Sequence, residues 1–271
     1  MEQYAVWNAE PVLLHLGALS IHWYGVLFAA ALGLGFAVMR LIYRHERRNE
    51  KELDSLLIYL TAGTLIGARL GHVLFYDPAF YLSHPWETLA IWRGGLASHG
   101  GALGIVAALW LYCRRHPGTG YIWLLDRITL PALLGGGLIR IGNFFNSEIV
   151  GVPTIVPWAI VFPHIDLLPR HPTQLYESAV YMVLFAIFCT LYRKSLIIAR
   201  PGMMAGFFLI LVFSARFILE FTKMPQATYE SSLLSVGQWL SIPSILIGIA
   251  LSYRAAIHSK KEVLACPTHP A

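Results

Sequence analysis

Residues 122–151 read IWLLDRITLPALLGGGLIRIGNFFNSEIVG, an apolar run that ends in a polar cluster. The run up to residue 142 has the length and composition of a transmembrane helix, which needs about 20 mainly apolar residues. Its end places an arginine, two asparagines, a serine and a glutamate within residues 140–148. Because charged side chains are costly inside a bilayer and usually mark a functional site, this stretch predicts both a membrane fold and the place of its chemistry.

The composition of the whole chain also indicates a membrane protein. Of its 271 residues, 56% are hydrophobic and 13% are charged, and the mean hydropathy is +0.59. Soluble proteins carry about 25% charged residues, and barrel strands are alternating segments of only about 10 residues. We therefore predict an all-α polytopic membrane protein with seven transmembrane helices, at residues 19–43, 54–76, 95–113, 122–142, 173–192, 202–221 and 235–254.

Basic residues cluster in the connections after the first, third, fifth and seventh apolar runs. By the positive-inside rule these connections face the cytoplasm, which puts the N-terminus outside and the C-terminus inside. The same distribution argues against a nucleic-acid partner, despite a pI near 9.2. Thirteen of the 20 basic residues lie there: Arg40, Arg44, Arg47, Arg48, Lys51, Arg114, Arg115, Arg193, Lys194, Arg200, Arg254, Lys260 and Lys261. The outer connections hold Arg93, Arg170 and Lys223.

We predict a single membrane domain over residues 1–271. Its parts are a periplasmic N-terminal segment (1–18), helices one to four (19–142), a small periplasmic head (143–172), helices five to seven (173–254) and a cytoplasmic tail (255–271). The N-terminus lacks the basic region and cleavage site of a signal peptide, so the first apolar run is expected to stay in the protein. Cys113, Cys189 and Cys266 lack metal-site spacing, and we expect them to be unpaired.

Glycines recur every four residues in the second apolar run, at Gly63, Gly67 and Gly71. Such a row lets a neighbouring helix approach closely, so we interpret it as a packing feature. The third run opens with RGGLASHGGALG, 93–104, whose five glycines loosen the helix or expose its backbone.

Polar residues of five apolar runs share one expected depth. At a rise of about 1.5 Å per residue, Arg69, His99, Arg140, Glu177 and Arg216 lie about 22–26 Å from the cytoplasmic helix ends. The hydrocarbon core is about 30 Å thick, so all five fall near the outer headgroups. The three arginines outnumber the expected buried carboxylates, Glu177 and Glu220. This surplus predicts an external anion, and a phospholipid phosphate matches the planar donors of arginine.

Simpler interpretations remain open for single residues. Arg216 with Glu220, or Arg140 with Glu148, could form ion pairs that fasten helices together. A histidine beside glycines, such as His99, is more often a packed and hydrogen-bonded residue than a catalyst. Next to surplus arginines, however, a histidine could accept the proton of a nucleophile.

Several segments resemble the prolipoprotein diacylglyceryl transferase family. RIGNFFNSEIVG (140–151) is similar to the family signature, and SHGGALG (98–104) is similar to its second hallmark. Further similar segments follow the family order: IHWYG (21–25), RHPTQLYE (170–177), RFILEF (216–221) and SVGQWLSIP (235–243). The resemblance covers essentially the whole chain. Two positions depart from it: Ile139 stands where glycine is frequent, and Val212 stands where tyrosine is frequent.

The resemblance implies an enzyme of bacterial lipoprotein maturation. It would transfer the diacylglyceryl group of phosphatidylglycerol to the lipobox cysteine of a prolipoprotein, form a thioether and release glycerol phosphate, as the first maturation step. The implied partners are phosphatidylglycerol, lipobox-containing signal peptides and membrane lipids, with no metal or soluble cofactor. The implied location is the bacterial inner membrane, with the active site in the outer leaflet facing the periplasm.

The same resemblance suggests a role for each candidate residue. We expect Arg140 and Arg216 to clamp the phosphate and stabilise its developing charge, and His99 to be the base for the thiol, which reacts as a thiolate. The expected headgroup residues are Asn143, Asn146 and Glu148, and Gly151 would permit a turn into the head. The expected supporting residues are Tyr24, Arg69, His171, Glu177 and Glu220.

Other classes of protein fit less well. A transporter or flippase for an anionic lipid or solute would also have buried arginines and glycine-broken helices, but no inverted repeat is visible. For an intramembrane protease, a GxSG motif is missing, and HERRN (45–49) lacks the second histidine of HExxH. A purely structural membrane protein would not need the surplus of buried positive charge.

Overall fold

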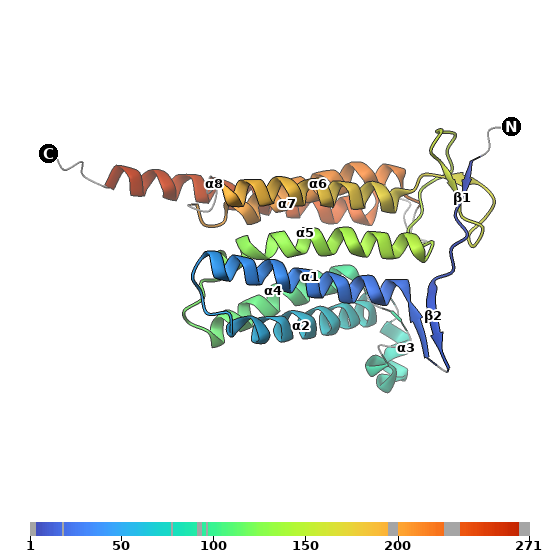
Figure 1. Ribbon diagram of the computed structural model, residues 1–271, viewed down its shortest axis with the longest axis horizontal. Coiled ribbons are helices and arrows are strands. Elements are labelled where there is room, and N and C mark those ends of the chain that lie inside the picture. The colour runs from blue at the N-terminus through green and yellow to red at the C-terminus, as the bar shows by residue number, and fades with distance from the viewer. Residues whose placement is uncertain are drawn as a thin grey trace. The chain divides into compact units, whose positions relative to one another are not determined.

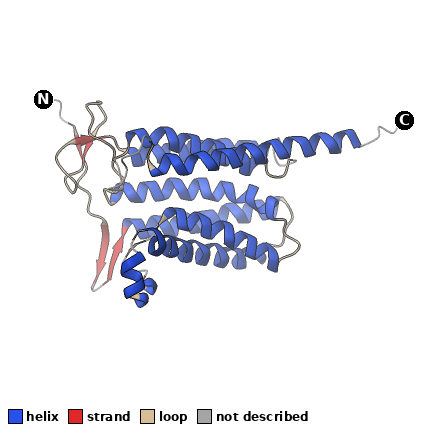
Figure 2. Ribbon diagram, turned by 180° about the vertical axis from the view of Figure 1, so that it is seen from behind, coloured by secondary structure: helices blue, strands red, loops and turns tan. Residues whose placement is uncertain are grey.

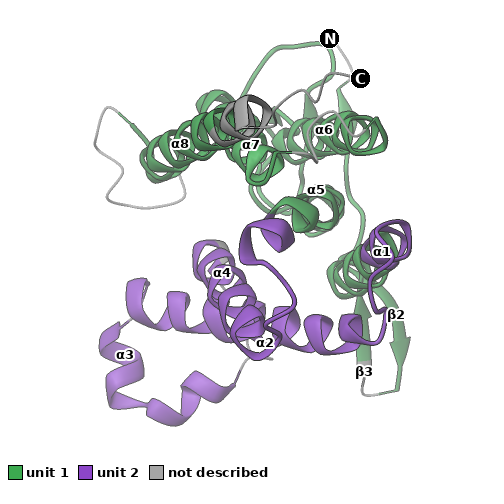
Figure 3. Ribbon diagram, turned by 90° about the vertical axis from the view of Figure 1, so that its left-hand side faces the viewer, with its two compact units in different colours: residues 1–38, 126–271 green, residues 39–125 purple. Residues whose placement is uncertain are grey.

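The computed structural model describes residues 4–17, 19–76, 78–90, 94–95, 97–194, 200–224 and 234–265. The chain divides into two compact units, which Figure 3 colours separately. Unit 1 comprises Met1–Val38 and Asp126–Ala271, and unit 2 comprises Met39–Leu125. Arg69 and His99 belong to unit 2, and the other candidate site residues belong to unit 1.

Long helices make up most of the described chain (Figure 1). They are α1 (Trp23–His45), α2 (Glu52–Phe75), α4 (Ser98–Arg115), α5 (Tyr121–Phe145), α6 (Thr173–Arg193), α7 (Met203–Leu219) and α8 (Val236–Ala265). Short helical segments lie at α3 (Pro78–Ser83), η1 (Pro85–Leu89) and η3 (Glu220–Thr222). Each long helix overlaps one of the expected apolar runs.

Six of the described helices are long and apolar enough to cross a membrane, which is consistent with a polytopic helical membrane protein. They are α1, α2, α5, α6, α7 together with η3, and α8. The helix α4 is not among the six. It has 18 residues, and these include Ser98, His99 and two terminal arginines, so its composition is less apolar than that of a typical span.

Most helix ends differ from the expected ones by a few residues, and three of the differences change the interpretation of a segment. Residues 19–22 form strand β3, and α1 starts only at Trp23. The helix α5 continues past residue 142 to Phe145, so Asn143 is helical. The helix α8 continues through residues 255–265, which we expected to be a tail, because this stretch is rich in good helix formers. Residues 266–271, including Cys266, lie outside the described residues.

Short strands were not expected in an all-α chain, but the described residues include five. Figure 2 shows strands in red. Strand β1 (Ala5–Val6) pairs in parallel with β4 (Ile160–Val161), and β4 pairs antiparallel with β5 (Pro169–Arg170). Strands β2 (Val12–Leu16) and β3 (Leu19–His22) form an antiparallel hairpin. Its turn uses Gly17, whose φ of 62° is accessible to glycine without steric cost. The N-terminal segment is therefore paired in a sheet with the connection between α5 and α6.

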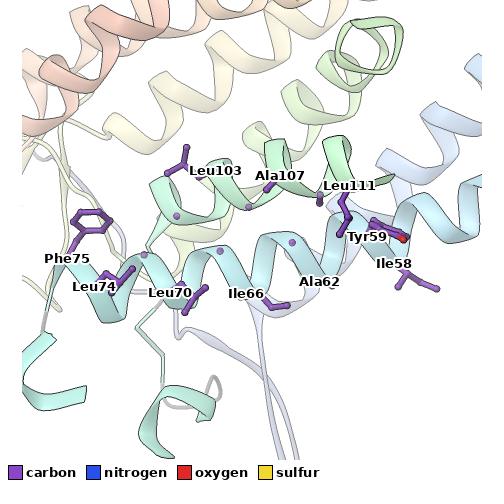
Figure 4. A pocket seen from close by; sticks show the side chains of 16 residues that line it. Ile58, Tyr59, Ala62, Ile66, Leu70, Leu74, Phe75, Leu103, Ala107 and Leu111 are labelled. Carbon is purple, nitrogen blue, oxygen red and sulfur yellow. The ribbon is translucent and has the colours of Figure 1, made fainter. Parts of the chain in front are cut away.

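In unit 2, glycines bring α2 and α4 into close contact. A Cβ atom added to Gly67 would lie 2.7 Å from the Gly104 Cα, and one added to Gly71 would lie 2.7 Å from the Gly100 Cα. This contact confirms that the glycine row is a packing feature. An open apolar groove of about 620 Å³ follows the same two helices (Figure 4). Its sides include Ile66 and other aliphatic residues.

In unit 1, α6, α7 and α8 lie side by side (Figure 1). A Cβ atom on Gly206 of α7 would lie 2.9 Å from the Gly248 carbonyl oxygen of α8. The start of α7 is held by Asp126 of α5, which is fully buried. Its carboxylate accepts hydrogen bonds from the N–H groups of Gly202 (2.7 Å) and Ala205 (2.8 Å). Asp126 thus satisfies backbone donors that a helix N-terminus would otherwise leave unpaired.

Candidate functional site

Aromatic packing holds the end of α5 in place. Trp7 donates a hydrogen bond from Nε1 to the carbonyl oxygen of Phe144 (3.0 Å), and the two rings lie 4.3 Å apart. The ring of Trp23 stacks on that of Phe145 at 4.6 Å. These contacts fix the last turn of α5, which carries Asn143.

The polar residues of the signature form one chain of contacts. Arg140 Nη1 donates to Asn143 Oδ1 (3.2 Å), one turn further along α5. Asn143 Nδ2 donates to Glu148 Oε2 (3.1 Å), and Asn146 Nδ2 donates to Glu148 Oε1 (3.2 Å). The structure therefore brings together four of the six residues that the sequence assigned to the phosphate and headgroup site.

Glu148 lies in a turn with unusual backbone angles. Its neighbours Ser147 and Ile149 have φ of 53° and 57°, a left-handed conformation that is rare for a β-branched residue. The carbonyl oxygen of Glu148 accepts a hydrogen bond from Gln174 Nε2 (2.6 Å), and that of Ile149 accepts one from Thr173 Oγ1 (2.8 Å). The first residues of α6 therefore hold the turn that presents Glu148.

Gly151 is required here by close packing and not by a left-handed turn. A Cβ atom at this position would lie 2.7 Å from the Thr222 carbonyl oxygen and would also meet His171. The Gly151 N–H donates to the carbonyl oxygen of His171 (2.9 Å). The ring of His171 contacts the Tyr176 hydroxyl through Nδ1 (3.1 Å), and that hydroxyl accepts a hydrogen bond from Trp158 Nε1 (2.7 Å).

Arg170 supports this same segment. It binds the Asp166 carboxylate with two nitrogens, at 2.5 and 3.1 Å, and donates from Nη1 to the Gly151 carbonyl oxygen (2.9 Å). These hydrogen bonds from Arg170 hold the pKa of Asp166 below its usual range. We therefore assign Arg170 a bracing role in the α5–α6 connection.

A buried network of charges links α5, α6 and the end of α7. Arg140 Nε and Glu177 Oε2 form a charge pair at 2.8 Å, without the alignment of a hydrogen bond. Lys223 Nζ lies 2.8 Å from Glu177 Oε1 and 3.0 Å from Glu220 Oε2. The side chains of Glu177 and Lys223 are each 4% exposed. Since little water reaches these charges, their interactions are stronger than those of a surface pair.

These pairings differ from the two that the sequence suggested. Arg140 pairs with Glu177 of another helix and not with Glu148. Glu220 pairs with Lys223 and not with Arg216. The sequence analysis assigned Lys223 only to an outer connection and missed its place in the network. Its position three residues after Glu220 is a spacing that could have indicated the pair.

Arg216 lies at a small cavity of about 10 Å³ that is also lined by Glu177, Tyr181 and Val212. No ion pair or hydrogen bond of the Arg216 side chain is found among the described residues. Val212 stands where tyrosine is frequent in the resembled family. Tyr181 of α6, which the sequence analysis missed, brings a phenol ring to the same cavity. The Arg216 guanidinium thus has no hydrogen-bond or ion-pair partner among the described residues, whereas Glu177 and Asn143 engage that of Arg140.

Tyr24 lies against the signature helix near the start of α1. A Cβ atom on Gly142 would lie 3.0 Å from Tyr24 Cδ2, and Tyr24 lies within electrostatic reach of Glu148 and Arg140. This placement fits the supporting role that we expected for it.

In unit 2, Arg69 donates hydrogen bonds to backbone carbonyl oxygens. Its guanidinium donates to the carbonyl oxygens of Thr88 (2.8 Å), Gly94 (2.7 Å), Gly95 (3.1 Å) and Glu87. The residue is 5% exposed. Because these carbonyls occupy its donors, Arg69 holds the backbone of η1 and of Gly94 and Gly95, and these donors are not open to an anion.

His99 is the second residue of α4 and is partly exposed. The segment before it is tied to α2 by a hydrogen bond from the Ala97 N–H to the Ala68 carbonyl oxygen (2.9 Å). The common depth that we predicted for His99, Arg69 and the arginines of unit 1 stays a prediction. Among the described residues, no group of three or more His, Cys, Asp or Glu side chains could hold a metal ion.

Comparison with known proteins decides the family. A family model described as prolipoprotein diacylglyceryl transferase matches residues 11–254. The chain belongs to the prolipoprotein diacylglyceryl transferase family. As a member of this family with several long apolar helices, it is a multi-pass membrane protein.

Members of this family from different bacteria align with nearly the whole chain. The phosphatidylglycerol–prolipoprotein diacylglyceryl transferase of Tolumonas auensis is 51% identical over 251 residues, which cover 92% of this chain and 97% of that protein. The protein of the same name from Chloroherpeton thalassium is 50% identical over 260 residues, or 96% and 97% of the two chains. That of Porphyromonas gingivalis is 43% identical over 269 residues, or 93% and 95%.

Two segments that resemble those of the diacylglyceryl transferase family interlock in this structure. The signature segment at 140–151 supplies the backbone groups of Glu148, Ile149 and Gly151. The segment at 170–177 supplies the groups that bind them, namely the Gln174 amide, the Thr173 hydroxyl and the His171 carbonyl. The sequence analysis placed His171 and Glu177 from this second segment but missed Thr173 and Gln174. Their signals were their position at the start of a predicted helix and within the segment at 170–177.

Proposed function

We propose that this chain transfers the diacylglyceryl group of phosphatidylglycerol to the lipobox cysteine thiol of a prolipoprotein, the first step of lipoprotein maturation. The cysteine sulfur forms a bond to the glyceryl carbon, and the bond between that carbon and the phosphate oxygen breaks. Glycerol phosphate leaves with the bonding electrons, and the thiol proton passes to a base. The names of the relatives and the cluster around Arg140 support this activity together.

The observation that carries the proposal is the contrast between Arg216 and Arg140. Arg140 is positioned by Glu177 and Asn143, which engage its Nε and Nη1 groups. Arg216 lines the neighbouring cavity without an ion pair among the described residues. A positioned guanidinium and an uncompensated one are suited to hold a phosphate and to stabilise the charge that develops as it leaves.

Asn143, Asn146 and Glu148 are proposed to bind the glycerol headgroup. Each of the two amides donates one hydrogen bond to the Glu148 carboxylate, so the carboxylate is held in a fixed orientation. An oriented carboxylate accepts hydrogen bonds from hydroxyl groups, which the glycerol of phosphatidylglycerol carries. His99 remains the proposed base for the thiol on chemical grounds.

The pairing of β1 with β4 supports seven transmembrane helices. Paired strands must lie on the same side of a membrane, so the number of spans between residues 6 and 160 must be even. The apolar helices α1, α2 and α5 would give an odd number. We propose that α4 also spans the membrane, in spite of its less apolar composition. The interval then has four spans: α1, α2, α4 and α5. Three further spans then place the C-terminus on the opposite side from the N-terminus.

The basic residues give these sides their identity. We propose that the N-terminal segment and the head at 143–172 face the periplasm, and that the connections with the basic clusters face the cytoplasm. The membrane is then the bacterial inner membrane, with the Arg140 cluster in its outer leaflet. The proposed partners are phosphatidylglycerol, the lipobox signal peptide and surrounding membrane lipids.

A reconstituted assay tests the activity. The purified full chain in phosphatidylglycerol vesicles is mixed with a lipobox peptide, and glycerol phosphate release and peptide lipidation are measured. Arg216→Ala and Arg140→Ala should each lower the rate by about 100-fold, as expected for loss of an oriented charge that stabilises the leaving group. His99→Gln should also lower it and change its pH profile.

Arg40→Gln is the matched control, because Arg40 is half-exposed and its ion pair among the described residues is a surface one, with Glu50. Its rate should stay near that of the unchanged chain. Near-normal rates for both site arginine variants, with folding intact, would refute the phosphate clamp. A chain that moves labelled lipid between leaflets but releases no glycerol phosphate would instead be a flippase.

A further inference from the structure

The turn at residues 147–149 is held by contacts from outside its own segment. Glu148 and Ile149 give their carbonyl oxygens to Gln174 Nε2 (2.6 Å) and Thr173 Oγ1 (2.8 Å). Both donors are at the start of α6, and both residues are 0% exposed. These side chains do not cap their own helix, whose N-cap position has no side-chain hydrogen bond. Their donors are used for the turn.

The turn needs such support because its conformation is unfavourable for its residues. Ser147 and Ile149 both have positive φ angles, of 53° and 57°. A non-glycine residue in this region costs about 1–3 kcal/mol and persists where surrounding contacts fix it. Isoleucine is a poor residue for this region because its Cβ is branched. Without the contacts from α6, the segment should relax towards ordinary angles.

Relaxation of the turn would change the direction of the Glu148 side chain. In the present conformation both carboxylate oxygens are used, one by Asn143 and one by Asn146. Those contacts join Glu148 to Arg140 through Asn143. The orientation of the whole polar chain therefore depends on two backbone angles that the local sequence disfavours.

We infer that Gln174 is a positioning residue, which acts by holding the strained turn that aims Glu148 at the headgroup site. The inference rests on the proposed function, because it explains how the glycerol-binding residues of that same site are oriented. Gln174 is fully buried, so we assign it an indirect role in substrate binding. Its amide nitrogen acts on the backbone of Glu148, and Thr173 assists on the next residue.

Two substitutions of Gln174 test this role in the full chain. Gln174→Leu keeps the approximate size and removes the donor, and Gln174→Glu replaces the donor by an acceptor that faces the Glu148 carbonyl oxygen. Each should raise the KM for phosphatidylglycerol by about three- to tenfold, the range expected for one lost hydrogen bond. The kcat should change much less, because ground-state binding of the headgroup is weakened.

A second substitution separates positioning from a general loss of structure. Glycine adopts positive φ without steric cost, so Ile149→Gly should let the turn keep its shape without help from Gln174. The double variant Gln174→Leu/Ile149→Gly should therefore recover most of the KM of the unchanged chain. Thr173→Val should weaken binding in the same direction. Thr129→Val is its matched control, because Thr129 is also buried and also donates to a carbonyl oxygen (2.6 Å), within α5.

Hydrogen exchange gives a readout that does not depend on catalysis. The N–H groups of Glu148 and Gly151 donate to Asn143 and His171 carbonyl oxygens, both at 2.9 Å. Their exchange should accelerate in Gln174→Leu and return in the double variant. Unchanged exchange and KM in Gln174→Leu, or a raised KM that Ile149→Gly does not reduce, would overturn the inference. If the unchanged chain transfers no diacylglyceryl group, the proposed function fails, and the exchange data still decide whether Gln174 holds the turn.

Discussion

Removal of Lys223 should destabilise the buried network, because two carboxylates share its charge. Its Nζ lies 2.8 Å from Glu177 and 3.0 Å from Glu220, and its side chain is 4% exposed. Loss of one partner from a buried ion pair costs about 3–5 kcal/mol, because the remaining charge is left without compensation. In Lys223→Met, Glu177 keeps Arg140, and Glu220 is 11% exposed. We therefore expect the free energy of unfolding to fall by about 3 kcal/mol, at the low end of that range.

The assay is a titration of the purified protein from mild detergent into a denaturing one, followed by circular dichroism. Lys223→Arg keeps the charge and should lose less stability than Lys223→Met, because neither carboxylate is left without a cation. The double variant Lys223→Met/Glu220→Gln should regain about 1–2 kcal/mol over Lys223→Met, since no unpaired carboxylate remains at residue 220. A loss below about 1 kcal/mol in Lys223→Met, or no recovery in the double variant, would show that the network does not depend on compensation of charge.

Further predictions concern other parts of the chain. Gly67→Ala should cost about 1–3 kcal/mol in the same unfolding assay, because its Cβ would meet the backbone of α4; Gly33→Ala is the control, since a Cβ there meets nothing within 4 Å. Asp126→Ala should lower stability by about 2 kcal/mol, through loss of two hydrogen bonds at the start of α7; a loss equal to that of a surface substitution would contradict this. For the Asp166–Arg170 pair, the pKa of Asp166 is lowered in the folded state, so its stabilising contribution should be complete above the unfolded value of about 3.9 and disappear as pH falls through the lower folded value. Hydrogen exchange in the α5–α6 connection should follow this pH dependence, and Asp166→Asn should abolish it.

The existence of the helices could be predicted from composition, but several of their ends could not. Long apolar runs identify helices because the backbone polar groups of each span must form hydrogen bonds within that span. The start of α1 was placed at residue 19, whereas residues 19–22 pair with Val12–Leu16 across a glycine turn. The apolar residues of a hairpin and those of a helix end have the same hydropathy. Whether such residues form a strand or a helix depends on their pairing with other segments, which hydropathy does not predict.

The residue types of the site could also be predicted, but most of their partners could not. Local spacing favoured the pairs Arg216–Glu220 and Arg140–Glu148. A single sequence indicates ion pairs only between residues that are close along the chain. In the structure Arg140 reaches Glu177 on another helix, and Lys223 takes Glu220. We counted Arg69 as an unpaired charge because its partners are backbone carbonyl oxygens. Every residue has a carbonyl oxygen, so the sequence does not indicate which of them accept hydrogen bonds from an arginine.

The pairing of β1 with β4 has a consequence for the biosynthesis of the protein. Ala5 and Val6 emerge first from the ribosome, but their partners Ile160 and Val161 are made more than 150 residues later. At about 5–20 residues per second, the N-terminal strand exists for about 10–30 s before its partner has been synthesised. Trp7 is likewise synthesised long before its hydrogen-bond partner Phe144. Ala5 and Val6 are therefore among the last residues to reach their final place, and the sheet that they form with the α5–α6 connection is complete only after β4 and β5 have been synthesised.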